Sequence, residues 1–199
     1  ELYLPAGYDE NREEPYKVLY LSHGAGGHEA DWFYQGNAGN IVDRLTAAGE
    51  CEPFIMVAMN NTIFDWDFDV IIDNVKNYLI PFVEENYNVS TEPEDRAFGG
   101  LSMGAMTTNK LLFDDPEYFG YYGLFSGSRV YEFPELDDYS AYHNTNLYLA
   151  AGWEDHAIIN KSLSFAYHGD TDMTTMGLAE KLDELGIPYN NGNDIVIVQ

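Results

Sequence analysis

Short apolar runs alternate with stretches of helical periodicity along this chain. The runs predict strands at residues 17–22, 54–59, 96–101, 121–125, 147–151 and 194–198. Apolar residues at helical spacing predict helices at 40–48, 68–87, 103–113 and 178–185, and Pro81 is expected to kink or split the second of these. Strands that are apolar throughout and alternate with helices are typical of an α/β protein with a mostly parallel sheet covered on both faces.

Composition adds a single domain and a strongly acidic surface to this picture. The 199 residues favour one domain, and 45% hydrophobic residues are typical of a globular chain. Nine Lys and Arg against 34 Asp and Glu give a net charge of −25, which disfavours nucleic acid and anionic membranes as partners. No apolar run is long enough to span a membrane. Cys51 is the single cysteine, so neither an internal disulfide nor a cysteine-based metal site is expected.

The segment from Gly100 to Gly104 reads Gly-Leu-Ser-Met-Gly and matches the G-x-S-x-G motif. A predicted strand precedes it and a predicted helix follows, so Ser102 is expected in a strained turn that lifts its hydroxyl above the sheet. Side chains at 100 or 104 would clash with neighbouring backbone. The turn also directs the backbone N–H of Met103 and the helix N-terminus at a developing oxyanion. Ser102 is therefore the predicted nucleophile.

A Gly-rich loop, His-Gly-Ala-Gly-Gly at residues 23–27, follows the first long strand. In an arrangement of this kind the loop supplies the second oxyanion donor, for which the backbone N–H of Ala25 is the candidate. His23 is expected to brace the loop rather than to act as a base. A phosphate-binding loop would end in G-K-[ST], which is missing here.

An acid and a base should follow the nucleophile in that order along the chain. Asp155 comes just after the predicted strand 147–151 and is the candidate for the carboxylate that orients a histidine. Many of the chain's acidic residues are expected to be solvated surface charges, so position is what favours Asp155. The alternatives that remain open are Glu154, Asp170 and Asp172.

The base is expected directly after the last strand, yet no histidine follows His168. His156 adjoins Asp155 in sequence, and adjacent residues seldom form the required hydrogen bond. His168 precedes a predicted helix and is the weaker in-chain alternative. We therefore expect the catalytic histidine beyond residue 199, in a single esterase domain whose C-terminal end lies outside this sequence.

The motifs resemble those of carbohydrate esterase family one, which contains feruloyl and acetyl-xylan esterases and has esterase D and mycolyltransferases as wider relatives. The likeness extends in order along nearly the whole chain, through residues 3–8, 18–27, 31–32, 41–45, 80–87, 96–104, 119–127 and 152–155.

The resemblance implies an α/β-hydrolase fold and a secreted plant-wall esterase that uses no metal or other cofactor. It places the nucleophile on Ser102, the acid on Asp155, and the oxyanion donors on Ala25 and Met103. The family's histidine would stand in a Gly-His-Asp-like segment just after Val198. The stretch 156–175 is longer than the family pattern leads us to expect.

The expected reaction is two-step acyl transfer through an acyl-enzyme. Its substrate would be a feruloyl or acetyl ester on xylan or a small ester, with other modules of a larger secreted enzyme as further partners. Trp32 and Trp66 are candidate platforms for a sugar or phenolic ring, although core packing is the alternative for such aromatics. Three other functions remain open: acyl transfer to a sugar, a catalytically impaired carbohydrate-binding pseudo-esterase, and an intracellular thioester or small-ester hydrolase.

Overall fold

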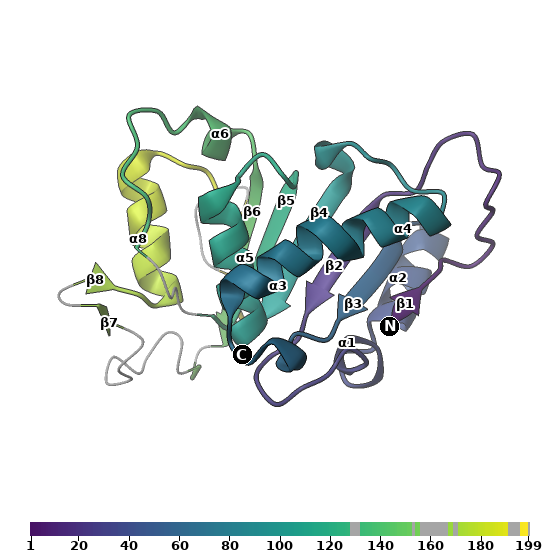
Figure 1. Cartoon of the computed structure of the whole chain (residues 1–199), viewed down its shortest axis with the longest axis horizontal. Helices are drawn as coiled ribbons and strands as arrows, with labels where there is room; N and C mark the ends of the chain where they lie inside the picture. Colours follow the sequence, from purple (N-terminus) through teal and green to yellow (C-terminus); the bar gives the residue numbers. More distant parts are fainter. Residues whose placement is uncertain (128–131, 153, 156–166, 169–170, 191–195, 199) are drawn as a thin grey trace.

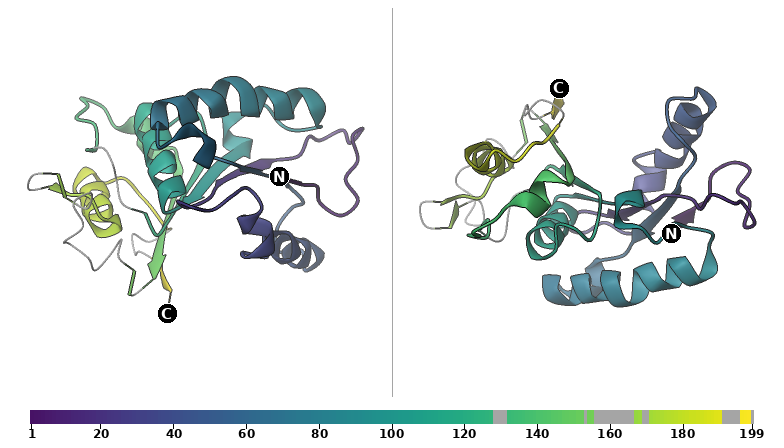
Figure 2. Two further views of the ribbon diagram at one scale, coloured as in Figure 1. Left: turned by 60° about the horizontal axis from the view of Figure 1, so that its bottom comes forward. Right: turned by 90° about the horizontal axis from the view of Figure 1, so that it is seen from above.

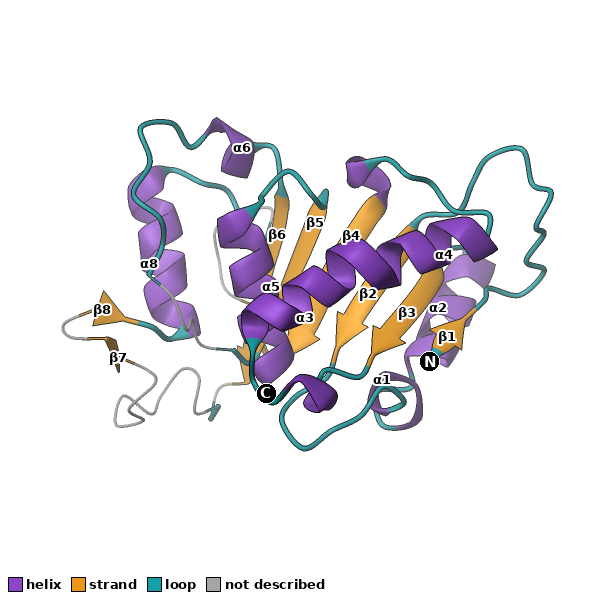
Figure 3. Ribbon diagram, viewed as in Figure 1, coloured by secondary structure: helices purple, strands orange, loops and turns teal. Residues whose placement is uncertain are grey.

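The computed structural model describes residues 1–127, 132–152, 154–155, 167–168, 171–190 and 196–198, which form a seven-stranded sheet flanked by helices (Figure 1). The strand order is β1-β3-β2-β4-β5-β6-β9, and all neighbours are parallel except β1 with β3 (Figure 3). The mostly parallel sheet is therefore confirmed. Its strands are β1 (Leu2–Tyr3), β2 (Val18–Ser22), β3 (Ile55–Met59), β4 (Arg96–Leu101), β5 (Tyr121–Phe125), β6 (Asn146–Gly152) and β9 (Val196–Val198).

The register of the central strands brings their carboxyl ends to one edge of the sheet. Ser22 pairs with Met59 on one side and with Gly100 on the other, and Leu101 pairs with Phe125. The loops that follow β2, β3, β4 and β5 therefore leave the sheet side by side. Ligand sites of open parallel sheets lie at this edge.

Helices lie on both sides of the sheet (Figure 2). On one face α5 packs against β4 and β5, and α8 joins the same hydrophobic core through Leu178 and Leu182. On the opposite face Val42 packs with Leu21 and Met56 in a smaller core. The first layer comprises α3 (Phe68–Asn74), η2 (Val75–Leu79), α4 (Ile80–Asn86), α5 (Met103–Asp114) and α8 (Thr175–Leu185), and the second α1 (Asp31–Tyr34) and α2 (Ala38–Ala47).

Pro81 splits the predicted helix 68–87 by a change of hydrogen bonding. A π-helical turn of five residues, η2, joins α3 to α4, and Pro81 stands in the first turn of α4. Proline has no N–H, and its ring clashes with the carbonyl four residues before it in a regular helix. The wider turn before Pro81 accommodates both effects. The chain therefore stays helical through Pro81, and the helix is divided only in its hydrogen-bonding pattern.

Several short elements were not predicted, because two to four residues carry no periodic signal. They are β1, α1, η1 (Thr62–Phe64), η3 (Pro93–Asp95), α6 (Ser140–His143) and the separate hairpin of β7 (Tyr167–His168) with β8 (Thr171–Asp172). The last predicted strand, 194–198, is described only as β9.

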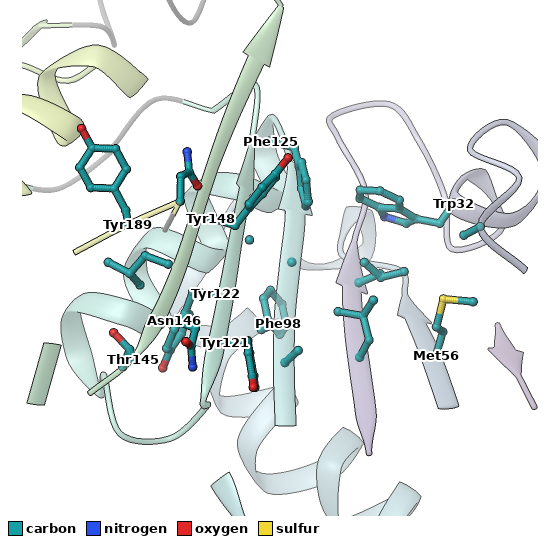
Figure 4. Close-up of a pocket in the computed structure, with 18 of the residues that line it drawn as sticks. Trp32, Met56, Phe98, Tyr121, Tyr122, Phe125, Thr145, Asn146, Tyr148 and Tyr189 are labelled. Carbon is teal, nitrogen blue, oxygen red and sulfur yellow. The ribbon is translucent and has the colours of Figure 1, made fainter. Parts of the chain in front are cut away.

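Among the residues that the structure describes, part of the second face of the sheet is left open beside α2. An apolar groove of about 690 Å³ runs across β4, β5 and β6 between α2 and residues 188–190 (Figure 4). The rings of Phe125 and Tyr148 lie side by side in the groove, with their centroids 5.8 Å apart. Tyr121 and Tyr148 keep 48% and 42% of their surface exposed. Within the described residues, α1 and α2 are the helices of this face, and the groove lies beside them.

Candidate active site

Ser102 occupies the sharp turn between β4 and α5. Its φ of 54° and ψ of −108° are strained for a residue with a side chain, and that side chain is exposed to solvent. The backbone N–H of Ser102 donates to the carbonyl of Phe125 (2.9 Å), which ties the turn to β5. The strand–turn–helix context predicted for this motif is confirmed, and we call residues 100–104 the elbow.

The two glycines of the elbow are required by close backbone contacts. A Cβ at Gly100 would lie 2.1 Å from the carbonyl carbon of Gly104, and a Cβ at Gly104 would lie 2.2 Å from the carbonyl oxygen of Ser22. Both neighbours are backbone atoms in the sheet or helix and cannot move aside. The prediction that side chains at 100 and 104 would clash with backbone is confirmed.

The loop 23–27 lies directly against the elbow. A Cβ at Gly24 would stand 3.4 Å from the Cβ of Ser102, and the turn is closed by the Gly27 N–H donating to the carbonyl of Gly24 (3.0 Å). Among the described residues, no acceptor takes a hydrogen bond from the N–H of Ala25. Met103 is the first residue of α5, so its N–H has no acceptor within the helix. The two predicted oxyanion donors therefore come from segments that touch each other beside Ser102.

His23 braces the loop, as expected. Its side chain is only 2% exposed, Nδ1 lies 2.7 Å from the carbonyl of Gly24, and Nε2 accepts a hydrogen bond from the backbone N–H of Asn61 (3.3 Å). Since Nε2 accepts, the proton belongs on Nδ1, which donates to Gly24. One ring nitrogen is therefore bonded to the loop and the other to Asn61, so neither is available to Ser102 as a base.

Asp155 lies at the carboxyl end of β6, two strands away from the elbow. Its backbone N–H donates to the carbonyl of Gly152 (3.0 Å) in a tight turn, and the residue is half-buried, whereas Glu154 is exposed. Asp172 lies instead in the separate β7–β8 hairpin, where its carboxylate accepts from the N–H of Thr174 (2.9 Å). Asp170 and His156 lie outside the described residues. His168 belongs to β7, and its side chain is not described.

The two predicted platform residues differ in their surroundings. Trp32 is half-buried, and its ring packs edge-on against Phe125 at 5.8 Å, at one end of the groove on the second face (Figure 4). Trp66 is 52% exposed, has a φ of 64°, and packs edge-on against Phe68 at 6.4 Å. Trp32 therefore packs against β5 and also lines the groove, while Trp66 presents a ring to solvent beyond the carboxyl end of β3.

The sequence reasoning missed a polar segment that follows β3. Asn61 has no exposed surface and is hydrogen-bonded to Ser22 and His23, while Thr62 donates to the carbonyl of Gly27 (3.2 Å). Three consecutive polar residues at the carboxyl end of an apolar strand were the available signal. Asn60, the first of the three, donates to the carboxylate of Glu29 (2.8 Å). The backbone N–H of Glu29 and this bond lower the pKa of Glu29.

In the part of the chain that the structure describes, no group of three or more His, Cys, Asp and Glu side chains is arranged to hold a metal ion. Within the described ranges, the helices are too short or too polar to span a lipid bilayer.

A parallel sheet with a serine elbow after a central strand and a Gly-rich loop beside it defines the α/β-hydrolase class. The family model for "Putative esterase" matches residues 1–131, and the chain belongs to this esterase family.

Known proteins agree with this assignment. The chain is 40% identical over 141 residues to an endo-1,4-beta-xylanase/feruloyl esterase of Xylanibacter ruminicola, covering 63% of this chain and 19% of that protein. It is 33% identical over 141 residues to endo-1,4-beta-xylanase Y of Acetivibrio thermocellus, covering 65% and 13%. The chain thus spans less than a fifth of the length of these curated relatives.

A solved structure extends the comparison to the whole chain. It is a serine-to-alanine mutant of the feruloyl esterase module from Clostridium thermocellum, complexed with sinapinate. The TM-score is 0.67 at 25% identity, and the match covers 99% of this chain and 74% of that one. The α/β-hydrolase fold and the resemblance to carbohydrate esterase family one are confirmed.

Proposed function

We propose that this protein is a serine carboxylic-ester hydrolase that acts through an acyl-enzyme on Ser102. The observation that supports this most directly is the exposed Ser102 side chain in a strained turn at the N-terminus of α5. Such strain persists only where the surrounding structure requires it, and it is commonly found at active sites. The N–H groups of Ala25 and Met103 donate to no acceptor among the described residues, and their segments meet at Ser102, an arrangement that suits a developing negative charge.

The proposed reaction follows from this arrangement. The Ser102 hydroxyl loses its proton to a histidine and attacks the ester carbonyl, and the carbonyl oxygen becomes an oxyanion held by Ala25 and Met103. Collapse expels the alcohol, which takes the proton back from the histidine. A water molecule then attacks the acyl-enzyme in the same manner and releases the acid.

We place the general base on a histidine that follows β9, oriented by Asp155. β9 runs parallel to β6, with Gly152 paired to Val198, so the chain leaves β9 at the sheet edge that carries Asp155. His168 is the alternative, and its strand β7 belongs to a hairpin separate from the main sheet. A base after β9 also agrees with the order of nucleophile, acid and base in this fold.

We propose feruloyl or acetyl esters of plant-wall xylan as substrates, within a larger secreted enzyme. The relatives, a xylanase/feruloyl esterase and a feruloyl esterase module, support this choice. The net charge of −25 agrees with a neutral polysaccharide better than with a polyanion. The proposed ring platforms are Trp66, exposed at the carboxyl edge, and Trp32, at the end of the groove.

The test compares Ser102→Ala with wild type in the full-length protein. We expect release of nitrophenol from a short-chain ester to fall by roughly 10⁴- to 10⁶-fold. Ser140→Ala is the matched control, because Ser140 lies exposed on α6, before β6 begins. Methyl ferulate, acetylated xylan and a xylo-oligosaccharide acceptor distinguish the two hydrolyses from acyl transfer. Full activity of Ser102→Ala would refute the proposal.

A further inference from the structure

Asn61 is a buried polar residue beneath the loop 23–27 that the proposed chemistry leaves without a role. It has 0% exposed surface, follows β3 and precedes η1. Its Nδ2 donates to Oγ of Ser22 (2.5 Å) and to the carbonyl of His23 (3.1 Å), and its backbone N–H donates to Nε2 of His23 (3.3 Å). One residue therefore holds both positions at which β2 turns into the loop.

The neighbours of Asn61 hold the far end of the same loop. Thr62 Oγ1 donates to the carbonyl of Gly27 (3.2 Å), and Asn60 Nδ2 donates to Oε2 of Glu29 (2.8 Å). The segment 60–62 thus contacts the loop near its start, at its last glycine and just beyond it. Within the loop, the His23 ring and the turn from Gly24 to Gly27 supply the remaining hydrogen bonds.

The atoms that Asn61 holds are also those that meet the elbow. A Cβ at Gly104 would lie 2.2 Å from the Ser22 carbonyl oxygen and 3.0 Å from that of His23. Asn61 donates to this same His23 carbonyl, so one backbone oxygen is fixed between Asn61 and the elbow. The spacing between the loop and Ser102 therefore depends on this carbonyl.

The hydrogen bonding of Asn61 is incomplete in a way that stability alone does not explain. Its Oδ1 is buried and accepts no hydrogen bond from the residues that the structure describes. A buried acceptor without a partner costs stability, and such exceptions in folded proteins are often found at functional sites. The side chain is thus useful for its two N–H donors, and both are directed at the base of the loop.

We propose that Asn61 is a positioning residue of the oxyanion hole, which sets the place of the Ala25 N–H relative to Ser102 and Met103. This inference rests on the proposed function. Without the Nδ2 donors, the His23 carbonyl loses its partner and the loop can move away from the elbow. A displacement of about 1 Å at a reacting centre costs on the order of 10²-fold in rate. Since the oxyanion forms only in the transition state, kcat falls while KM changes little.

The test is Asn61→Asp in the full-length protein, which keeps the size of the side chain and removes both donors. We expect kcat for nitrophenyl acetate to fall by about 10- to 100-fold, with KM within about threefold of wild type. The inhibition constant of phenylboronic acid, whose tetrahedral adduct mimics the transition state, should rise by a similar factor. Thr62→Val changes an exposed residue and should give a smaller loss of kcat. This variant tests the inference if Asn61→Asp does not fold.

Asn88→Asp is the matched control. Nδ2 of Asn88 donates to the carbonyl of Arg12 (2.7 Å) near the amino end of β2, so the same chemical change is made at the opposite edge of the sheet. It should lower the melting temperature without changing kcat or boronate affinity. Unchanged kcat in both Asn61→Asp and Thr62→Val, or an equal loss in Asn88→Asp, would overturn the inference. If the proposed function itself is wrong, Ser102→Ala will instead retain full activity.

Discussion

Gly104 is the position at which the structure makes its most quantitative prediction. An alanine there would place Cβ 2.2 Å from the Ser22 carbonyl oxygen, whereas real Cβ atoms essentially never approach below 3.0 Å, so about 0.8 Å of movement is required. Ser22 belongs to β2, which is hydrogen-bonded on both sides, so α5 must move away from the sheet. The movement separates Ser102 from the loop 23–27.

Two effects of Gly104→Ala follow from this movement. Overpacking of this kind costs about 1–3 kcal/mol of unfolding free energy, of which the better helix propensity of alanine returns less than about 1 kcal/mol. The displaced elbow should lower kcat by roughly 10²-fold. Urea denaturation followed by tryptophan fluorescence measures the first effect, and nitrophenyl acetate hydrolysis by the full-length protein measures the second.

Gly39→Ala is the control for Gly104→Ala. Gly39 lies in α2. Among the described residues, a Cβ there would meet the Tyr3 ring alone, at 3.3 and 3.4 Å, and a small rotation of that side chain relieves the contact. We expect its unfolding free energy to change by less than about 1 kcal/mol and its kcat to stay at the wild-type value. If Gly104→Ala matches Gly39→Ala in both measurements, the elbow does not rest on Ser22 as described.

Two further predictions concern stability. Thr174 is the buried N-cap of α8, and its side chain accepts a hydrogen bond from the Gly177 N–H (3.2 Å). Thr174→Ala should therefore lower the unfolding free energy, measured by urea denaturation, by about 1 kcal/mol. An unchanged denaturation midpoint would contradict this role. Burial raises the pKa of Tyr142 from 10.0 to about 12, so the folded state retains the Tyr142 proton to higher pH than the unfolded state. The resulting stabilisation is complete below pH 10 and is lost as pH rises through about 12. Tyr142→Phe should therefore reduce the fall of unfolding free energy with pH over that range, whereas Tyr34→Phe, at an exposed position, should leave it unchanged. Equal slopes in wild type and Tyr142→Phe would refute the assignment.

The sequence predicted the elements of the site wherever local patterns determine them. Strand 121–125 and strand 96–101 have the predicted bounds, since each is a short apolar run closed by turn residues. The elbow was predictable because the two glycines of G-x-S-x-G stand where a side chain would clash with neighbouring backbone. The expected role of His23 was also confirmed, since a histidine that begins a Gly-rich loop has backbone acceptors close by in sequence.

The remaining features depend on contacts that a single sequence does not display. Asn61 and Ser22 meet only because β2 and β3 lie side by side in parallel, and nothing in the local sequence at 60–62 indicates that pairing. Trp32 contacts Phe125 on β5 and lines the end of the groove, a pairing of segments that the sequence alone does not display. The groove on the second face was likewise hidden, because apolar strands look the same with or without a helix above them.

The two halves of the proposed chemistry rest on different parts of the sheet. The elbow follows β4, the loop 23–27 follows β2, and Asn61 follows β3. These three strands are adjacent, and continuous hydrogen bonding in the middle of the sheet fixes their register. Asp155 follows β6, and the proposed base follows β9 at the edge. Charge stabilisation needs donors placed in advance to within a fraction of an ångström, whereas proton transfer tolerates a side chain that adjusts. The middle of the sheet is therefore the physically appropriate support for the oxyanion hole, and buried Asn61 extends that rigidity from the strands into the loop.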